Sequence, residues 1–443
     1  MPPRATRRLA AGWRASLAMA LAGVLVASAA AAASADAPAQ ASLIEQGRYL
    51  ATAGDCISCH TRPKGTPFAG GLPLTTPFGV IYSANITPDP ATGIGAWSEQ
   101  QFARALREGI AADGRHLYPA FPYTAYTKVT DQDVHAIYAF LRSLKPVRYT
   151  PPPNAMHFPF SVRGLLAGWN LLYLQASRFL PDAARSAEWN RGAYLVQGLG
   201  HCGACHTPRN RLGGEDDSQR LAGGVYLDEI TDEVIDDRLA PMDERTVRLW
   251  SAANLTQASS GLAAWAVDEI AAYLKTGHNA RAGAFGPMST VIANSTSHLS
   301  AGDIRAMAVY LKSLPPAAPS ERPKADEARR RAGEIAYTAR CGDCHQSTGL
   351  GMPRSRDADP SKTAPPLAGN SALQAPSPAT LINVVLYGAH EAVPGPESWP
   401  KMSGFELSIG LDDEQIAALC TYVRSSWGNR AGPVDAADVA RQH

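Results

Sequence analysis

The residues best able to do chemistry are cysteines and histidines in a repeated spacing. Six of the seven cysteines form three Cys-x-x-Cys pairs, and a histidine follows each pair directly. The two thiols of such a pair can add to the two vinyl groups of one porphyrin, and the adjacent imidazole then lies below the iron. The spacing therefore predicts three covalently bound haem c groups (and their iron), held by nine residues: Cys56, Cys59, His60, Cys202, Cys205, His206, Cys341, Cys344 and His345.

Three other chemistries use the same residue types. A structural zinc site would normally include a second cysteine or histidine pair close by. A thioredoxin-like motif needs neither the trailing histidine nor repetition, and structural disulfides do not require this spacing. Three identical spacings, each with its histidine, favour haem attachment over all of these.

The second axial ligand of each iron decides what a haem does. Methionine in that position gives a six-coordinate, high-potential electron carrier. Two methionines follow a predicted glycine-ended helix at similar distances: Met288 lies 11 residues after Gly277, and Met402 lies 14 after Gly388. We therefore predict that Met288 and Met402 bind the second and third irons.

The first unit has no methionine at this position. Phe121 lies 12 residues after Gly109, and no methionine occurs between Cys56 and Thr150. Phenylalanine cannot bind iron. The first haem is then five-coordinate, or it is ligated by His116 or by Met156, and the sequence leaves these alternatives open.

The elements that position these residues repeat along the chain. A short segment with helical character precedes each motif. After each motif, apolar residues recur at i, i+3 and i+7 over residues 133–144, 303–314 and 413–426, which places them on one helical face. We expect Asp131, Asp303 and Asp413 to cap these later helices. The predicted fold class is all-α, with three tandem cytochrome c domains, each a small helical domain around one covalent haem.

Two further features accompany the motifs. The first two units share an Asn-x-Thr sequence, at 85–87 and 254–256, with no predicted role. Pro63 and Pro208 closely follow the first two motif histidines, and a nearby backbone carbonyl is expected to accept the imidazole N–H and orient the ring.

Proline-rich joints mark the predicted boundaries. They divide the chain into domain 1 (36–150), a linker (151–190), domain 2 (191–320), domain 3 (321–430) and a C-terminal tail (431–443). The linker contains a largely apolar stretch, 158–180. It either lies at a membrane interface or against a partner, or it packs between domains.

The N-terminus resembles a secretory signal peptide over residues 1–35. Arg4, Arg7 and Arg8 precede an apolar stretch that ends at a small-x-small cleavage site, 33–35. An uncleaved anchor is the alternative, because about 20 apolar residues can span a bilayer. The prediction is a periplasmic protein, peripheral on the outer face of the bacterial inner membrane. A net charge of +1 offers no basic field for nucleic acid.

Three longer motifs support a family resemblance. They are Gly-x-Gly-His-Cys-x-x-Cys-His-Thr-Pro-Arg-Asn at 198–210, Asn-Ser-Thr-Ser-His-Leu at 294–299, and Tyr-Val-Arg-Ser-Ser-Trp-Gly-Asn at 422–429. With them, residues 40–430 resemble the three-haem cytochrome c subunits of membrane-bound periplasmic dehydrogenases, which oxidise alcohols, gluconate, sorbitol or aldehydes. The resemblance implies His206/Met288 and His345/Met402 as ligand pairs.

The resemblance also implies partners. Such subunits take electrons from a large catalytic subunit, which is a quinoprotein, a flavoprotein or a molybdenum hydroxylase. They pass the electrons to ubiquinone or another respiratory acceptor such as a terminal oxidase. Phe121 departs from the alcohol-oxidising members, and its Tyr-Pro-Ala-Phe-Pro-Tyr context (118–123) looks more like the cytochromes that accompany molybdenum hydroxylases.

The predicted function is therefore a non-catalytic electron-transfer subunit. No nucleotide loop or catalytic triad is present in the sequence. Two other functions compete with it: a free-standing periplasmic electron carrier, and a haem peroxidase that uses an open first haem. The peroxidase lacks an identifiable distal acid or base.

Overall fold

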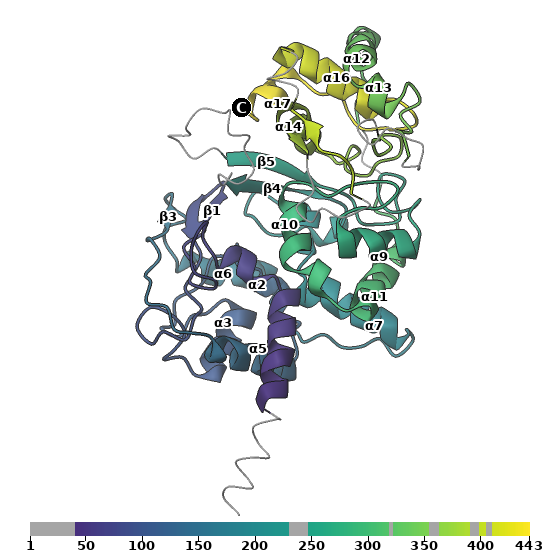
Figure 1. The fold of residues 1–443 in the computed structure, drawn as a ribbon. Coiled ribbons are helices and arrows are strands. Elements are labelled where there is room, and N and C mark those ends of the chain that lie inside the picture. Colours follow the sequence, from purple (N-terminus) through teal and green to yellow (C-terminus); the bar gives the residue numbers. More distant parts are fainter. Residues whose placement is uncertain (1–39, 230–246, 319–321, 354–362, 390–397, 405–409) are drawn as a thin grey trace, which may run out of the picture.

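The computed structural model describes residues 40–229, 247–318, 322–353, 363–389, 398–404 and 410–443. The predicted signal peptide therefore lies outside the described residues. Three short helices form the motifs themselves: α2 (Cys56–Cys59), α8 (Gly203–His206) and α13 (Gly342–His345). Other short helices connect the longer elements (Figure 1): α4 (Tyr123–Tyr126), α6 (Leu165–Tyr173), α10 (Pro287–Asn294) and α17 (Ala436–Ala440).

One helix crossing occurs three times, once around each motif. A helix before the motif packs across the helix that ends the unit, and a glycine lies at each point of contact. A Cβ atom on this glycine would lie 1.9–2.0 Å from a carbonyl oxygen of the later helix. The three crossings are the helix 40–53 with α5 (Asp131–Ser143) through Gly47 and Ala136, α7 (Ala187–Tyr194) with α11 (Ala301–Lys312) through Gly192 and Ala306, and α12 (Glu327–Arg340) with α16 (Asp413–Ser425) through Gly333 and Ala418.

The periodicity predicted the three later helices within two residues at each end, but the predicted caps are wrong. The Thr130 hydroxyl caps α5, the Ser300 hydroxyl caps α11 and the Asp412 carboxylate caps α16. A capping residue must have extended backbone before the first helical residue. The predicted aspartates, at 131, 303 and 413, already lie inside the first turn, where their charge complements the helix dipole.

A third helix in each unit ends at a glycine, as predicted. These helices are α3 (Glu99–Glu108), α9 (Val267–Thr276) and α14 (Ala379–Tyr387). Their C-caps are Gly109, Gly277 and Gly388, with φ of 66°, 84° and 84°. A positive φ is accessible to glycine without a steric penalty, so each glycine turns the chain towards the segment that contains Phe121, Met288 or Met402.

The fold is mainly helical, but it also contains three small antiparallel sheets that the all-α prediction did not include. Their strands are β1 (Pro73–Thr76), β2 (Gly79–Tyr82) and β3 (Ala155–Met156); β4 (Gly224–Glu229) and β5 (Val247–Ala252); β6 (Gly388–Ala389) and β7 (Met402–Ser403). Strands of two to six residues carry too little periodicity to be recognised from sequence.

Two buried clusters form the core. One cluster runs through the first two units and joins Leu50 and Val129 to Leu195 and Leu199. The other lies within the third unit. The β4–β5 hairpin lies between the third unit and the rest of the molecule (Figure 1), and Thr380 of α14 exchanges hydrogen bonds with Ser251 of β5.

The apolar stretch 158–180 is only partly packed. Trp169 donates to the Leu212 carbonyl, and Phe179 packs edge-on against Tyr194. Seven of the eleven exposed large hydrophobic side chains of the described residues nevertheless fall in this stretch: Phe158, Phe160, Val162, Leu165, Leu171, Leu172 and Leu180. None of the helices in the described ranges has the length and apolar character needed to cross a membrane.

Candidate functional site: three cysteine and histidine motifs

Each motif folds as a single helical turn. Residues i and i+3 of a helix lie on one face, so the two cysteines of each motif point to the same side. The turn is α2 in the first motif, α8 in the second and α13 in the third. All seven cysteines lie in the described residues and none forms a disulfide.

The motif histidines share one hydrogen-bonding arrangement. The Nδ1 atom of His60 lies 2.6 Å from the Ala84 carbonyl oxygen, that of His206 lies 2.7 Å from Ala253 O, and that of His345 lies 3.1 Å from Pro365 O. A carbonyl only accepts, so Nδ1 must carry the proton. Nε2 then keeps its lone pair for a metal.

The two Asn-x-Thr sequences position the first two of these carbonyls, those of Ala84 and Ala253. The Asn85 Oδ1 atom accepts from the Thr87 amide at 2.9 Å and from its hydroxyl at 2.7 Å, and Asn254 and Thr256 repeat both bonds at 2.8 and 2.7 Å. Ala84 and Ala253 immediately precede these asparagines. The expected acceptor near Pro63 or Pro208 is thus wrong, because the carbonyl comes from a segment that folds back over the motif.

Burial shifts the pKa values of the motif histidines and of several motif cysteines away from their ordinary values. It lowers the pKa of His60, His206 and His345, although the carbonyl bond opposes the shift. It raises the pKa of the Cys56 and Cys202 thiols to about 12 and that of the Cys205 thiol to about 11. Neutral imidazoles with a free Nε2, beside paired thiols that form no disulfide, fit covalent haem.

Met288 and Phe121 occupy equivalent positions. The Ala284 amide donates to the carbonyl of cap residue Gly277 at 2.6 Å, and Met288 follows four residues later. In the first unit, the Leu117 amide donates to the Gly109 carbonyl at 2.7 Å, and Phe121 follows four residues later. Met288 lies in the first turn of α10, directly after Pro287.

Met402 lies in a different setting. It pairs with Ala389 in the β6–β7 hairpin, next to the cap residue Gly388. Part of the segment that joins these strands, 390–397, lies outside the described residues. The structure thus places Met402 beside the glycine-ended helix of its unit.

The first two motifs contact each other's units directly. Asn294, at the end of α10, donates to the Ser58 hydroxyl inside the first motif at 2.9 Å. His201, which precedes Cys202, places its Nε2 3.3 Å from the carbonyl oxygen of Gly54. Sequence reasoning treated the Asn294 segment only as a family marker, and the structure shows that it packs on the first motif.

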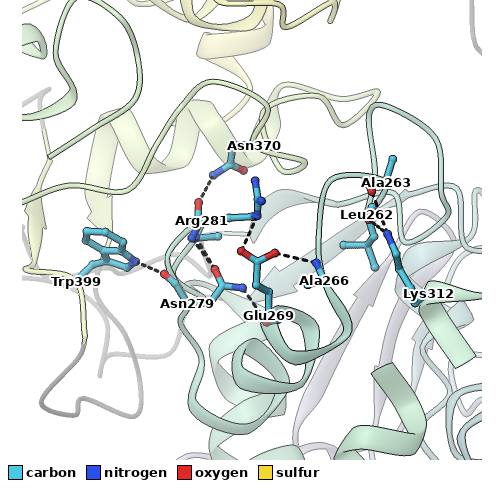
Figure 2. A network of polar contacts seen from close by, with 10 residues as sticks. Leu262, Ala263, Ala266, Glu269, Asn279, Arg281, Lys312, Asn370 and Trp399 are labelled. Carbon is cyan, nitrogen blue, oxygen red and sulfur yellow. Dashed lines mark hydrogen bonds and ion pairs between the residues drawn. The ribbon is translucent and has the colours of Figure 1, made fainter. Parts of the chain in front are cut away.

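The second and third units meet near their proposed methionine ligands. Figure 2 shows the Trp399 indole donating to the Asn279 carbonyl at 3.1 Å and the Asn370 amide close to the Arg281 carbonyl. Glu269 pairs with Arg281 at 2.9 Å and steadies this loop. Asn279 and Arg281 lie between Gly277 and Met288, and Trp399 lies three residues before Met402, so the two methionine-containing segments are neighbours.

Known proteins are similar to this chain in sequence. The family model for cytochrome c matches residues 44–145 and 331–427. The cytochrome c subunit of a quinone alcohol dehydrogenase from Gluconacetobacter polyoxogenes is 37% identical over 422 residues, which is 91% of this chain and 84% of that protein. The chain belongs to the cytochrome c subunits of dehydrogenases.

Other relatives of this cytochrome subunit differ in length. The fructose dehydrogenase cytochrome subunit of Gluconobacter japonicus is 38% identical over 90% of this chain and 82% of its own length. A nicotinate dehydrogenase subunit from Pseudomonas putida is 44% identical over 87% of this chain, which spans only 30% of that protein. The family consists of electron-transfer subunits, so the expectation of a non-catalytic role is confirmed.

Proposed function

We propose that this cytochrome subunit carries three covalent haem c groups and conducts electrons between them. The observation that supports the number is the threefold recurrence of one arrangement: a helical Cys-x-x-Cys-His turn, a carbonyl bound to the histidine Nδ1, and a glycine-mediated helix crossing. The family model does not match the second unit, which nevertheless has all three features. Bound haem would supply a reversible one-electron couple.

The haem number has a direct test. We expect the exported protein to bind three haems per chain in the pyridine haemochrome assay, and the intact mass to show three covalent additions. Changing both cysteines of one motif to alanine should remove one haem. A chain with only two haems, at the first and third motifs, would contradict the proposal.

The ligand pairs His206/Met288 and His345/Met402 remain part of this proposal, as does His60 for the first iron. Met288 is supported by its fixed place in α10, and Met402 by its pairing beside Gly388. The boundaries 36–150, 191–320 and 321–430 are the proposed domain limits. Replacing either methionine with alanine should lower the reduction potential of one haem only.

The partner we propose is a large dehydrogenase catalytic subunit: a quinoprotein, a flavoprotein or a molybdenum hydroxylase. Names of the relatives support a dehydrogenase, but they span several substrates. Purifying the tagged protein from detergent-solubilised membranes should retain a stoichiometric large subunit, identifiable by mass spectrometry. A protein that elutes alone would favour the free-standing carrier.

We also propose export to the periplasm and peripheral attachment to the inner-membrane surface, with ubiquinone or a terminal oxidase as electron acceptor. The exposed apolar side chains of residues 158–180 support membrane contact. If these side chains instead dock on the catalytic subunit, the purified complex will protect them from labelling and the isolated subunit will not bind vesicles.

A further inference from the structure

The first unit carries a phenylalanine where the second carries a proposed iron ligand. Two backbone features fix this equivalence. Leu117 N–Gly109 O and Ala284 N–Gly277 O are the same bond after the same helix. The bridge between Ile110 and His116 corresponds to that between His278 and Gly283, and Phe121 and Met288 each follow the bridge by five residues.

The same register argues against His116 as a substitute ligand. His116 corresponds to Gly283, a position with no side chain in the unit where Met288 is available. Phe121, and not His116, therefore holds the position that matches Met288. The His116 Nδ1 atom is buried without a hydrogen-bond partner in the described part of the chain, so His116 is tested directly.

The sheet register argues against Met156. Met156 pairs with Gly79 at the far end of β2. Ala84, whose carbonyl accepts from His60, lies five residues further along the chain. At about 3.3 Å per residue, this separation is roughly 16 Å along the strand direction.

The surroundings of Phe121 are apolar and their hydroxyls are already engaged. Its ring lies 5.4 Å from that of Tyr126 and 6.5 Å from that of Tyr123, centroid to centroid. The Tyr126 hydroxyl donates to the Gly54 carbonyl, and the Tyr123 hydroxyl donates to Asn170. Both tyrosine hydroxyls next to Phe121 therefore donate within the protein, and the partly buried Phe121 side chain packs against the core of the first two units.

We infer that Phe121 leaves the first haem without a second protein ligand and makes its distal side a site for neutral diatomic ligands, with carbon monoxide as the probe. The inference rests on the proposed haem at Cys56 and Cys59. Phenylalanine and methionine fill similar volumes, so the substitution keeps the fold of the turn while removing the donor sulfur.

The test uses the full exported protein with its haems attached. A peptide mass first establishes that the segment with Cys56 and Cys59 carries haem. The dithionite-reduced protein is then titrated with carbon monoxide and followed in the Soret region. We expect one carbon monoxide per chain. Phe121→Met should abolish this binding and increase the red charge-transfer absorption typical of methionine-ligated ferric haem, whereas Phe121→Leu, which adds no donor, should still bind.

Three results would overturn the inference. One is a first motif that carries haem while the protein binds no carbon monoxide. Another is carbon monoxide binding that appears only in His116→Ala or Met156→Leu, since that residue would then be the ligand. The third is a Phe121→Met variant that binds as well as the parent. A first motif without haem would instead contradict the proposed function.

Discussion

At the scale of single residues, Asn85 and Asn254 explain how a distant carbonyl is held under each of the first two histidines. Each asparagine side chain folds the residues after it into a tight turn, and the carbonyl before it then faces the imidazole. Asn85 also donates to the Val147 carbonyl at 2.8 Å and to the Tyr149 carbonyl at 3.2 Å.

We predict that Asn85→Ala destabilises the protein by about 1–3 kcal/mol, because buried partners lose their hydrogen bonds. Asn254→Ala is the matched comparison, since within the described residues the Asn254 amide donates to the Ser260 hydroxyl and to no backbone carbonyl. The loss should be smaller there, as measured by urea unfolding. Equal losses of unfolding free energy in the two variants would show that the hydrogen bonds from Asn85 to the Val147 and Tyr149 carbonyls contribute nothing to stability.

A second residue-scale prediction concerns Asp55, which precedes the first motif. Burial raises its pKa to about 7, and the bond from the Ser58 hydroxyl only partly opposes this shift. The folded protein therefore favours the neutral carboxyl, whereas the unfolded chain ionises near pH 3.8. Stability from this group is complete below pH 3.8 and is lost as pH rises to about 7.

Asp55→Asn should remove this dependence. Its gain in unfolding free energy over the parent should grow between pH 4 and pH 7, reaching at most about 4 kcal/mol. Denaturation at a series of pH values measures it. Asp268→Asn is the control, because that side chain is 90% exposed, and a gain independent of pH at position 55 would contradict the argument.

At the scale of elements, the three glycine contacts determine how closely the paired helices approach. Gly192→Ala or Gly333→Ala would press a methyl group against a backbone carbonyl of the partner helix, which cannot move without separating the helices. We predict a loss of about 3 kcal/mol or more. Gly302→Ala, in the exposed part of α11, has only the Ser300 hydroxyl within 4 Å and should stabilise by about 0.5–1 kcal/mol.

The sequence predicted these elements unevenly, for physical reasons. Periodicity located α5, α11 and α16, because apolar residues on one face must be buried. The caps were missed because Asp, Ser and Thr are all good caps and several stand close together near each start. The motif cysteines and histidines could be identified from spacing alone. The Asn-x-Thr role could not, since it depends on a contact between residues 24 apart.

At the scale of the whole molecule, the exposed apolar side chains of residues 158–180 predict attachment to a bilayer. Leu171 and Leu172 are 87% and 67% exposed, so replacing both with aspartate costs the folded protein no core packing. Burial of a leucine contributes about 1.5–3 kcal/mol. The double variant should bind phospholipid vesicles at least about 100-fold more weakly in a sedimentation assay.

Leu350→Asp provides the control for this assay. Leu350 is also exposed, at 62%, but lies in the third unit. Its vesicle affinity should match that of the parent. If the Leu350→Asp control weakens vesicle binding equally, the 158–180 segment is not the attachment surface.

Contacts between units, such as Asn294 with Ser58 across 236 residues, are the part of the fold that periodicity and spacing could not predict.

The packing of α10 on the first motif also sets an order of events during biogenesis. The thiols of Cys56 and Cys59 must be accessible while haem is attached, yet Asn294 and Ser295 bind the residues around them in the finished protein. Synthesis delivers the first motif more than 200 residues before α10. Haem should therefore reach the first motif most readily before the second unit folds, because the end of α10 afterwards binds Ser58 and Ala53 beside the two thiols.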